Sequence, residues 1–455
     1  MINAIRARCF KSWRDTERVR LAPLTGFFGS NSSGKSSITQ VLLLLKQTAE
    51  SPDRKRVLHT GDKRSLVDLG TFFDLIHGHE SETAVTLGLE WSDPDHFTVP
   101  DPDDPRLVLH DAEDLSFETR VTERNGRAVV EEFSYRFDNC VLGMRRRQDS
   151  GTTKDEYDLI HEGYQANRVQ GRAWPMRSPV KCYGFPDEAT RYYQNTESLP
   201  DLVFSLESCL GRVAYLGPLR SYPERTYVWA GDKPVDVGRQ GESAVAALLA
   251  AKSAGQKSGR GFGKARRYAT IEHRIGEWLQ KMGLVYSYTL KPIAPNRKDY
   301  ELRVKQSAAG AEVLITDVGF GVSQILPVLV LCYYVPEGST IILEQPEIHL
   351  HPKVQADLAD VIIEVVQERN VQVILESHSE HLLRRIQRRV AEGTIASEKT
   401  ALYFCQLQRG DSRIEQLRMN DSGRIDNWPT GFFGDELGEL AAMTEAAIGR
   451  ENRPS

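Results

Sequence analysis

The residues best suited to chemistry lie near the N-terminus, in the segment GSNSSGKS at positions 29–36. This segment matches the pattern G-x-x-x-x-G-K-[ST] in full. Its glycines let successive backbone N–H groups converge on phosphate oxygens without a Cβ clash, and Lys35 adds a positive charge for β- and γ-phosphates. The Ser36 hydroxyl can bind Mg²⁺, and the following helix points the positive end of its dipole at the same place. The predicted nucleotide-binding residues are Gly29, Ser30, Asn31, Ser32, Ser33, Gly34, Lys35, Ser36 and Ser37.

A second motif is the run TIILEQPEIHLHP at positions 340–352, in which an apolar strand ends in acids. An acid at the carboxyl end of a buried parallel strand meets the metal that accompanies a bound nucleotide. We expect Glu344 to face Mg²⁺ through a water molecule, with Ser36 as the other metal-binding residue. Gln345 and Glu347 follow directly, and both are candidates for work on the attacking water.

A third motif is the apolar strand VQVILES, which is followed by His378. A histidine at a strand end beside a γ-phosphate can donate a hydrogen bond to the transferred phosphate or to the attacking water. A single histidine is more often structural. The order of phosphate loop, acidic strand and this strand favours a catalytic role for His378.

A fourth motif is the turn DVGFGVSQ at positions 317–324, which precedes the acidic strand. Two glycines and a serine at the start of a helix form another anion-binding turn, although a plain tight turn is the alternative. A second phosphate-binding turn far from the first suggests composite sites, each shared between two subunits. The candidate residues of this turn are Gly319, Gly321, Ser323 and Gln324.

The elements that must position these motifs form a split α/β pattern. Residues 1–80 contain strands, the glycine-rich turn and a helix, and α/β character returns at 311–400. Between them, residues 81–310 are interpreted as an α+β insertion, with antiparallel strands first and helical and basic segments after them. Residues 401–455 are the expected short C-terminal extension.

Composition and charge restrict the partners. The chain has 455 residues, 58 Lys+Arg, 63 Asp+Glu and a formal net charge of −5, which argues against a surface coated with positive charge for nucleic acid. Basic clusters at 145–147, 257–267 and 384–389 leave a local DNA-binding groove open. By composition, the acidic stretch 93–104 and the glycine-rich stretch 252–267 are expected to be loops.

Cysteine usage and apolar runs indicate a compartment. None of the six cysteines forms a C-x-x-C pair, so we expect neither a disulfide framework nor a zinc site, and a reducing environment fits. The longest apolar run, residues 325–335, is too short to span a bilayer, and the N-terminus lacks a signal-like apolar segment. We therefore expect a cytoplasmic protein without membrane contact.

These four blocks, in this order, resemble the ATP-binding-cassette (ABC) type of ATPase. The SMC and RecF heads and the OLD-like AAA-family bacterial ATPases are the more similar groups. The run E-x-P-E-x-H-L-H-P and the strand ending in S-H-S are most similar to the OLD-like group. The segment WPTGFFGDE at 428–436 resembles a short C-terminal extension, of unknown role, on a subgroup of those ATPases.

The resemblance implies an ABC-type head with a mixed sheet and a head-to-tail homodimer that encloses two ATP–Mg²⁺. The phosphate loop of one subunit would face the turn at 317–324 of the other, and a higher oligomer stays open. Many relatives act in phage defence or DNA repair. OLD nucleases carry a Toprim domain after the head, but too few residues follow here, so any effector, nuclease or toxin, is expected to be a separate protein.

One departure from the family pattern concerns catalysis. Cassette ATPases end the acidic strand in Asp-Glu, whereas this chain has Glu344 followed by Gln345. An amide can orient water but cannot take its proton, so either Glu347 is the base or turnover is slow and ATP acts as a clamp. The expectation is an ATPase whose ATP-dependent dimerisation controls an anti-phage effector. A non-hydrolysing ATP-binding scaffold and a RecF-like DNA-repair ATPase are the alternatives.

Overall fold

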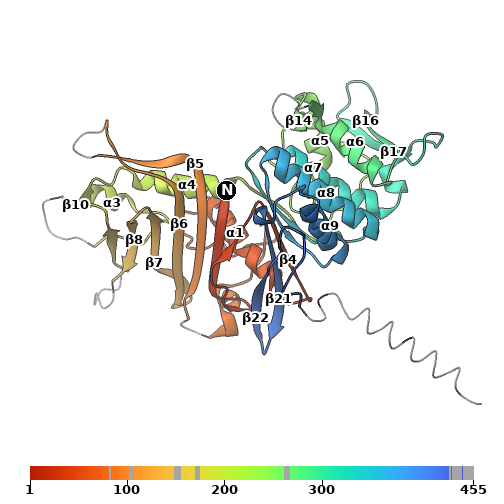
Figure 1. Cartoon of the computed structure of the whole chain (residues 1–455). Coiled ribbons are helices and arrows are strands. Elements are labelled where there is room, and N and C mark those ends of the chain that lie inside the picture. Colours follow the sequence, from red (N-terminus) through yellow and green to blue (C-terminus); the bar gives the residue numbers. More distant parts are fainter. Residues whose placement is uncertain are drawn as a thin grey trace, which may run out of the picture.

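The computed structural model describes residues 1–80, 83–101, 106–147, 155–169, 175–260 and 267–429, together with Phe432 and Met443. The described chain combines helices with three larger sheets (Figure 1). The architecture is mixed α/β, which confirms the expected fold class.

A six-stranded mixed sheet, here called the central sheet, holds the motifs and has the order β12-β19-β20-β4-β21-β22. Its antiparallel edge strand is β22 (Asp411–Leu417), which pairs with β21. Five parallel neighbours complete it: β12 (Val213–Leu216), β19 (Thr340–Glu344), β20 (Gln372–Glu376), β4 (Leu24–Gly29) and β21 (Thr400–Gln408).

Helices cover both faces of the central sheet, because alternate residues of its strands point to opposite sides. Ile342 and Ile374 belong to the core that contains α1 (Lys35–Glu50). Ile341 and Val373 belong to the core on the other face. The helices of that second face are α7 (Phe320–Tyr334), α8 (Pro352–Arg369) and α9 (Glu380–Ala391).

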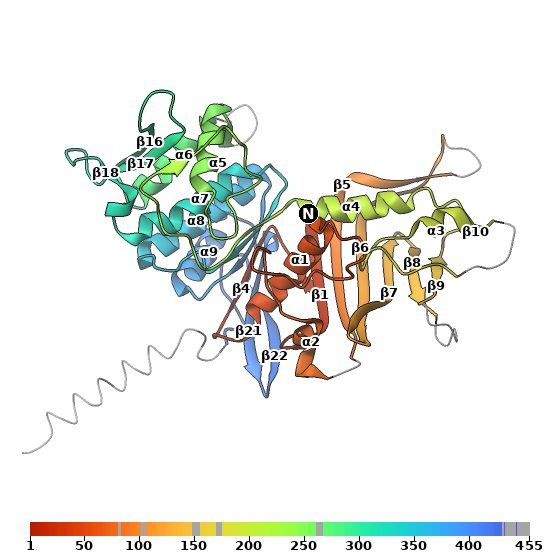
Figure 2. The same ribbon diagram turned by 180° about the vertical axis from the view of Figure 1, so that it is seen from behind.

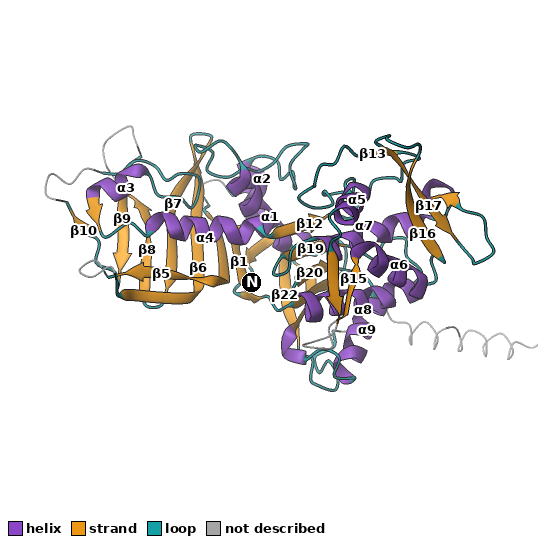
Figure 3. Cartoon of the chain, turned by 90° about the horizontal axis from the view of Figure 1, so that it is seen from above, coloured by secondary structure: helices purple, strands orange, loops and turns teal. Residues whose placement is uncertain are grey.

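A large antiparallel sheet, here called the insertion sheet, lies beside the central sheet (Figure 2). Helix α4 (Leu199–Gly211) runs across its strands (Figure 3). As the alternating pattern predicts, the strands after residue 80 pair in antiparallel order. The strands of this sheet are β1 (Ile2–Phe10), β2 (Trp13–Asp15), β3 (Val19–Arg20), β5 (Val85–Pro100), β6 (Val108–Arg124), β7 (Arg127–Phe137), β8 (Cys140–Arg146) and β9 (Tyr157–Glu162).

A third group of elements packs against α7. Its helices are α5 (Ala244–Ser253) and α6 (Ile271–Lys281), and its main strands are β16 (Ser287–Pro292) and β17 (Asp299–Lys305). The remaining short elements are α2 (Phe72–Leu75), η1 (His77–His79), β10 (Asn167–Arg168), α3 (Asp187–Tyr192), β11 (Tyr193–Gln194), β13 (Tyr227–Val228), β14 (Lys257–Arg260), β15 (Arg267–Thr270), β18 (Val313–Leu314), η3 (Ile315–Asp317) and η4 (Ser397–Lys399).

Two stretches expected to be loops differ in the structure. Strand β5 continues through the acidic segment to Pro100, because Phe97 and Val99 are buried and resume pairing with β6 after a bulge. In the glycine-rich stretch, β14 and β15 pair as an antiparallel hairpin. Residues 102–105 and 261–266 lie outside the described part of the chain.

The expected boundaries at 81, 310 and 400 also differ from the sheet topology. Strand β12 lies inside the expected insertion but pairs with β19 in the central sheet. Strands β21 and β22, assigned in part to the C-terminal extension, belong to that same sheet. Conversely, β1 pairs with β5 in the insertion sheet. Short apolar runs such as VAYL carry no signal of the sheet that they join.

Two global expectations concern cysteines and membranes. All six cysteines carry free thiols. Across the described residues, no helix combines the length and the apolar character needed to cross a bilayer.

Candidate functional site

Three motifs meet because of strand order. Strands β4, β20 and β19 are parallel neighbours, so their carboxyl ends lie at one edge of the central sheet, here called the motif edge. The phosphate loop follows β4, Glu344 ends β19, and His378 comes two residues after β20. The structure therefore brings Lys35, Glu344 and His378 to the same edge.

The phosphate loop needs its two glycines. Gly29 has φ +138°, and a Cβ there would lie 2.0 Å from the Cys405 carbonyl oxygen. Gly34 has φ +87°, and a Cβ there would lie 2.5 Å from the Ser412 Oγ atom. The Trp13 indole N–H also donates to the Gly34 carbonyl at 3.0 Å, which fixes the turn into α1. Larger side chains at either glycine would displace the loop.

Lys35 is folded over the loop. Its Nζ donates to the carbonyl oxygens of Gly29 at 3.1 Å and Ser30 at 2.7 Å, and only 3% of the residue is exposed. Burial lowers the pKa of Lys35, while the carboxylate of Glu376 raises it. The ammonium is thus held where phosphate oxygens could replace carbonyl oxygens as its partners.

The rest of the loop divides into an internal and an exposed part. Ser33 is buried, and its hydroxyl donates to the Ser30 carbonyl at 2.8 Å. Asn31 and Ser32 are exposed, and Ser36 and Ser37 are half-buried at the first turn of α1. Ser33 therefore holds the loop, whereas the exposed Asn31 and Ser32 face solvent.

Two carboxylates face the first turns of α1. Glu344 and Glu376 are register partners on β19 and β20, and each stands two residues after an isoleucine of the core that contains α1. Alternation along a strand therefore points both carboxylates to the α1 side. The Thr39 hydroxyl donates to the Glu344 Oε1 atom at 3.4 Å.

The pKa of each of these two carboxylates is raised. Burial, together with the negative charge of Glu376, raises the pKa of Glu344 to about 7. Burial also raises the pKa of Glu376, although the Ser36 hydroxyl and the Lys35 ammonium oppose that rise. A cation placed between Ser36 and these acids would relieve the cost of burying them.

The sequence interpretation assigned no role to Glu376. The sequence does show that Glu376 is an acid at the end of the strand before His378, which is the same strand-end position that Glu344 occupies. Seeing that the two acids are neighbours requires the strand order, which motif spacing does not give.

The donor set suits Mg²⁺, which prefers oxygen ligands and keeps several waters. The chain offers the Ser36 hydroxyl and the Glu344 and Glu376 carboxylates at one place. Within the described ranges, no group of three or more His, Cys, Asp or Glu side chains could hold a metal. A magnesium ion here would depend on nucleotide phosphates and water for its other ligands.

Gln345 turns the chain sharply at the end of β19. Its backbone has φ +45°, and its N–H donates to the Glu376 carbonyl at 2.8 Å. Its half-buried side chain lies within hydrogen-bonding reach of the Glu376 carboxylate. The amide is therefore at the motif edge, beside an acid.

Glu347 ties the acidic strand to the histidine segment. Its Oε1 accepts hydrogen bonds from the Ser377 hydroxyl at 2.8 Å and from the His378 backbone N–H at 2.7 Å. Glu347 is 6% exposed, its Oε2 atom has no hydrogen-bond partner among the described residues, and burial raises its pKa. One oxygen is committed to positioning His378, so the role of Glu347 as a base stays a prediction.

His378 is half-buried at the same edge. It interacts with the Gly29 backbone, and burial and the Lys35 charge lower its pKa. The next residue, Ser379, caps α9 by accepting from the Leu382 N–H at 3.0 Å. Both effects favour the neutral imidazole, which can donate one hydrogen bond.

Arg220, to which the motifs assign no role, also lies at this edge. Its Nη2 donates to the Glu344 carbonyl at 3.4 Å. The Nε and Nη1 atoms are buried without a partner in the described structure, and burial lowers the pKa of Arg220 to about 10. By contrast, Arg225 pairs with Asp317 at 3.0 Å.

The turn at 317–324 is placed on the other face of the central sheet. Gly319 precedes the first residue of α7, whose apolar residues pack in the second core. Ser323 and Gln324 are buried, and the Ser323 hydroxyl donates to the Phe320 carbonyl at 2.9 Å. Gly319 and Gly321 have no close contact that would exclude a ligand. Within one chain, this turn and α1 therefore lie on opposite faces of the central sheet.

Two of the three basic clusters, at 145–147 and 384–389, are paired with acids, and most of the third, at 257–267, lies outside the described residues. Arg145, Arg146 and Arg147 pair with Glu132, Asp155 and Asp158. On α9, both Arg385 and Arg389 bind the Asp360 carboxylate on α8. These arginines hold elements together, which leaves less positive charge for a nucleic-acid backbone.

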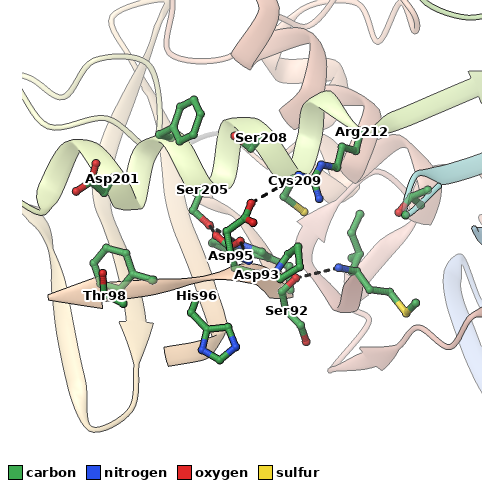
Figure 4. A pocket seen from close by; sticks show the side chains of 18 residues that line it. Ser92, Asp93, Asp95, His96, Thr98, Asp201, Ser205, Ser208, Cys209 and Arg212 are labelled. Carbon is green, nitrogen blue, oxygen red and sulfur yellow. Dashed lines mark hydrogen bonds and ion pairs between the residues drawn. The ribbon is translucent and has the colours of Figure 1, made fainter. Parts of the chain in front are cut away.

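A cavity of about 320 Å³ lies elsewhere, between β5 and α4 (Figure 4). Two polar pairs line it: the Ser205 hydroxyl donates to Asp93, and Arg212 and Asp95 lie 4.0 Å apart. Thr340, at the start of the acidic strand, lines it, but none of the candidate site residues does.

Comparison with protein families gives two matches. Residues 264–383 match the AAA ATPase domain, a range that includes the turn at 317–324, the acidic strand and His378. Residues 395–443 match a family described as protein of unknown function, DUF3696. The first match supports an ATP-binding ATPase, although the phosphate loop lies outside the matched range. No curated protein matches the chain.

Solved structures similar to the chain include heads of SMC proteins. An SMC head bound to the C-terminal winged-helix domain of ScpA aligns with a TM-score of 0.46 and 12% identity, covering 92% of this chain and 98% of that one. The SMC head domain from Thermotoga maritima gives a TM-score of 0.42 and 10% identity over 92% and 99% of the two chains. The Pyrococcus furiosus head with an extended coiled coil, bound to ScpA, gives 0.43 and 11% over 98% and 99%. These identities are too low to transfer a function.

Proposed function

We propose that the protein binds ATP with Mg²⁺ at the motif edge and hydrolyses it slowly. The observation that carries this proposal is the meeting of Lys35, Glu344 and His378 at one end of three adjacent parallel strands. The match of residues 264–383 with the AAA ATPase domain supports it independently of the phosphate loop.

The position of each residue indicates its role in binding ATP and Mg²⁺. Backbone N–H groups of residues 29–36 and the Lys35 ammonium would hold the β- and γ-phosphates. Ser36 and Glu344 would hold Mg²⁺, which when bound neutralises phosphate charge. His378, whose pKa is lowered by burial and by the Lys35 charge, would donate a hydrogen bond to the γ-phosphate.

The attacking water would be oriented by the Gln345 amide. An amide accepts a hydrogen bond but not a proton, and general-base help is worth about 10²- to 10⁴-fold. Glu347 is the candidate base, through its unpartnered Oε2 atom. Without such help, turnover is slow and the ATP-bound state lasts long.

ATP would act as the clamp of a head-to-tail homodimer. The turn at 317–324 lies across the central sheet from α1, so a second subunit would have to supply it. Exposed apolar side chains at that turn support a contact surface: the rings of Tyr222 and Phe320 lie against each other and are 77% and 56% exposed. The family resemblance supports a separate nuclease or toxin as the controlled effector in anti-phage defence.

One rival function has a specific observation in its favour. Gln345 at the position of the usual catalytic glutamate favours a non-hydrolysing ATP-binding scaffold. A RecF-like role on DNA is less favoured, because the arginine clusters are paired with acids.

The test compares phosphate release and dimerisation in wild type and Glu347→Gln. We expect slow release by wild type, an approximately 10²-fold or greater loss in the variant, and ATP-dependent dimers of both in light scattering. Release at background in both proteins, with dimers retained, would favour the scaffold. Stimulation of wild-type release by duplex DNA would favour the repair alternative.

A further inference from the structure

We infer that Glu376 is a second carboxylate of the magnesium site, acting beside Glu344 on the divalent cation that accompanies ATP. The inference rests on the proposed ATP site and extends it, because the sequence motifs assign only Ser36 and Glu344 to the metal.

Glu376 stands in the right place for this role. It is the register partner of Glu344 on the neighbouring strand, and on its other side it pairs with Phe27, two residues before the phosphate loop. Both carboxylates project to the α1 side of the sheet. Glu376 is thus the nearer of the two to β4 and to the loop that follows it.

The contacts of Glu376 point to the metal ligand of the loop. The Ser36 hydroxyl lies within hydrogen-bonding reach of the Glu376 carboxylate, whereas the Glu344 carboxylate contacts Thr39, one turn further along α1. A cation bound to Ser36 would therefore meet Glu376 first and Glu344 beside it.

Glu376 also keeps an unused oxygen. The residue is 3% exposed, and its Oε2 atom has no hydrogen-bond partner among the described residues. Lys35 does not neutralise it directly, because the Lys35 Nζ donates to two carbonyl oxygens of the loop. A buried carboxylate oxygen without a donor is costly, and a divalent cation is a partner that would satisfy it.

A purely structural role is the competing explanation, since Glu376 also contacts the Gln345 side chain. The two roles differ in one measurable quantity. Loss of a structural carboxylate weakens nucleotide binding equally with and without metal, whereas loss of a metal ligand reduces the gain that Mg²⁺ brings and does not weaken binding without metal.

The test measures the affinity of the full chain for a fluorescent ATP analogue in EDTA and in Mg²⁺. For Glu376→Gln we expect the affinity in EDTA to be unchanged or tighter, and the gain from Mg²⁺ to fall about 10- to 100-fold. Glu344→Gln should behave alike, and Glu398→Gln, an exposed acid away from the site, should match wild type. A wild-type gain in Glu376→Gln would overturn the inference.

A second variant covers the case in which Glu376→Gln does not fold. Glu376→Asp keeps the charge but shortens its reach, so we expect weaker Mn²⁺ binding in the nucleotide complex, followed by electron paramagnetic resonance. Unchanged Mn²⁺ affinity would overturn the inference. If wild type binds nucleotide equally in EDTA and in Mg²⁺, the metal site is overturned but the ATP site is not. If wild type binds no nucleotide in either buffer, the ATP site itself is overturned.

Discussion

The motif edge and the insertion sheet differ in whether their buried polar atoms have hydrogen-bond partners. At the motif edge, Arg220, Glu347 and Glu376 each keep a buried charged atom without a partner in the described structure. In the insertion sheet, the buried Tyr135 hydroxyl donates to the Tyr183 carbonyl at 2.9 Å and the Tyr157 hydroxyl donates to the Val130 carbonyl at 2.7 Å. Unpaired buried polar atoms destabilise a fold, so three charged side chains with such atoms at one edge indicate a place kept ready for a ligand.

The largest effect should come from the core of the insertion sheet. Phe133 is fully buried there, and Phe133→Ala should lower the free energy of unfolding by about 3–5 kcal/mol. At low temperature, where the variant stays folded, its ATP affinity should equal that of wild type. Chemical denaturation and nucleotide titration measure the two quantities, and a parallel loss of both would break the division between the regions.

The second effect concerns pH at the motif edge. Burial raises the pKa of Glu344 from 4.5 to about 7, so the folded state favours the protonated acid. The stability that this preference contributes is complete below about pH 4.5 and is lost as pH rises through about 7, by roughly 3 kcal/mol in all. Glu344→Gln, which is always neutral, should lose less stability than wild type between pH 5 and pH 8.

Urea unfolding in magnesium-free buffer checks that difference. Glu398→Gln is the matched control, because that carboxylate is exposed. Identical pH dependence of stability in wild type and Glu344→Gln would contradict the raised pKa of the buried Glu344 carboxyl.

The smallest effect should come from a surface pair of the insertion sheet. Arg145 and Glu132 lie 2.8 Å apart, but their side chains are 59% and 36% exposed. Arg145→Ala should cost at most about 1 kcal/mol and should leave ATP affinity unchanged. Thermal unfolding in low and high salt measures this. A loss of duplex DNA binding in the variant would instead revive the nucleic-acid alternative.

The sequence predicted the motifs better than their surroundings. The phosphate loop, Glu344 and His378 could be found because their spacing carries a chemical meaning that does not depend on the rest of the chain. Glu376 and Arg220 were not assigned, because their role depends on β20 lying between β4 and β19 and on β12 joining the same sheet. Long-range strand order leaves no local pattern in a sequence.

Loop predictions failed for a different reason. Asp and Pro content made residues 93–104 look irregular, but the buried alternate residues Phe97 and Val99 let β5 resume pairing with β6 after a bulge. Burial of two side chains outweighed the turn propensity of their neighbours.

Calorimetric titration of ATP–Mg²⁺ into wild type and Lys35→Ala tests the central claim most directly. Lys55→Ala, which changes an exposed lysine outside the loop, is the control. We predict one nucleotide bound per wild-type and per Lys55→Ala chain, and binding weakened roughly 100-fold or more in Lys35→Ala because a charge-assisted contact to phosphate is lost. Well-folded wild type that takes up no nucleotide, or equal binding by Lys35→Ala, would contradict the account.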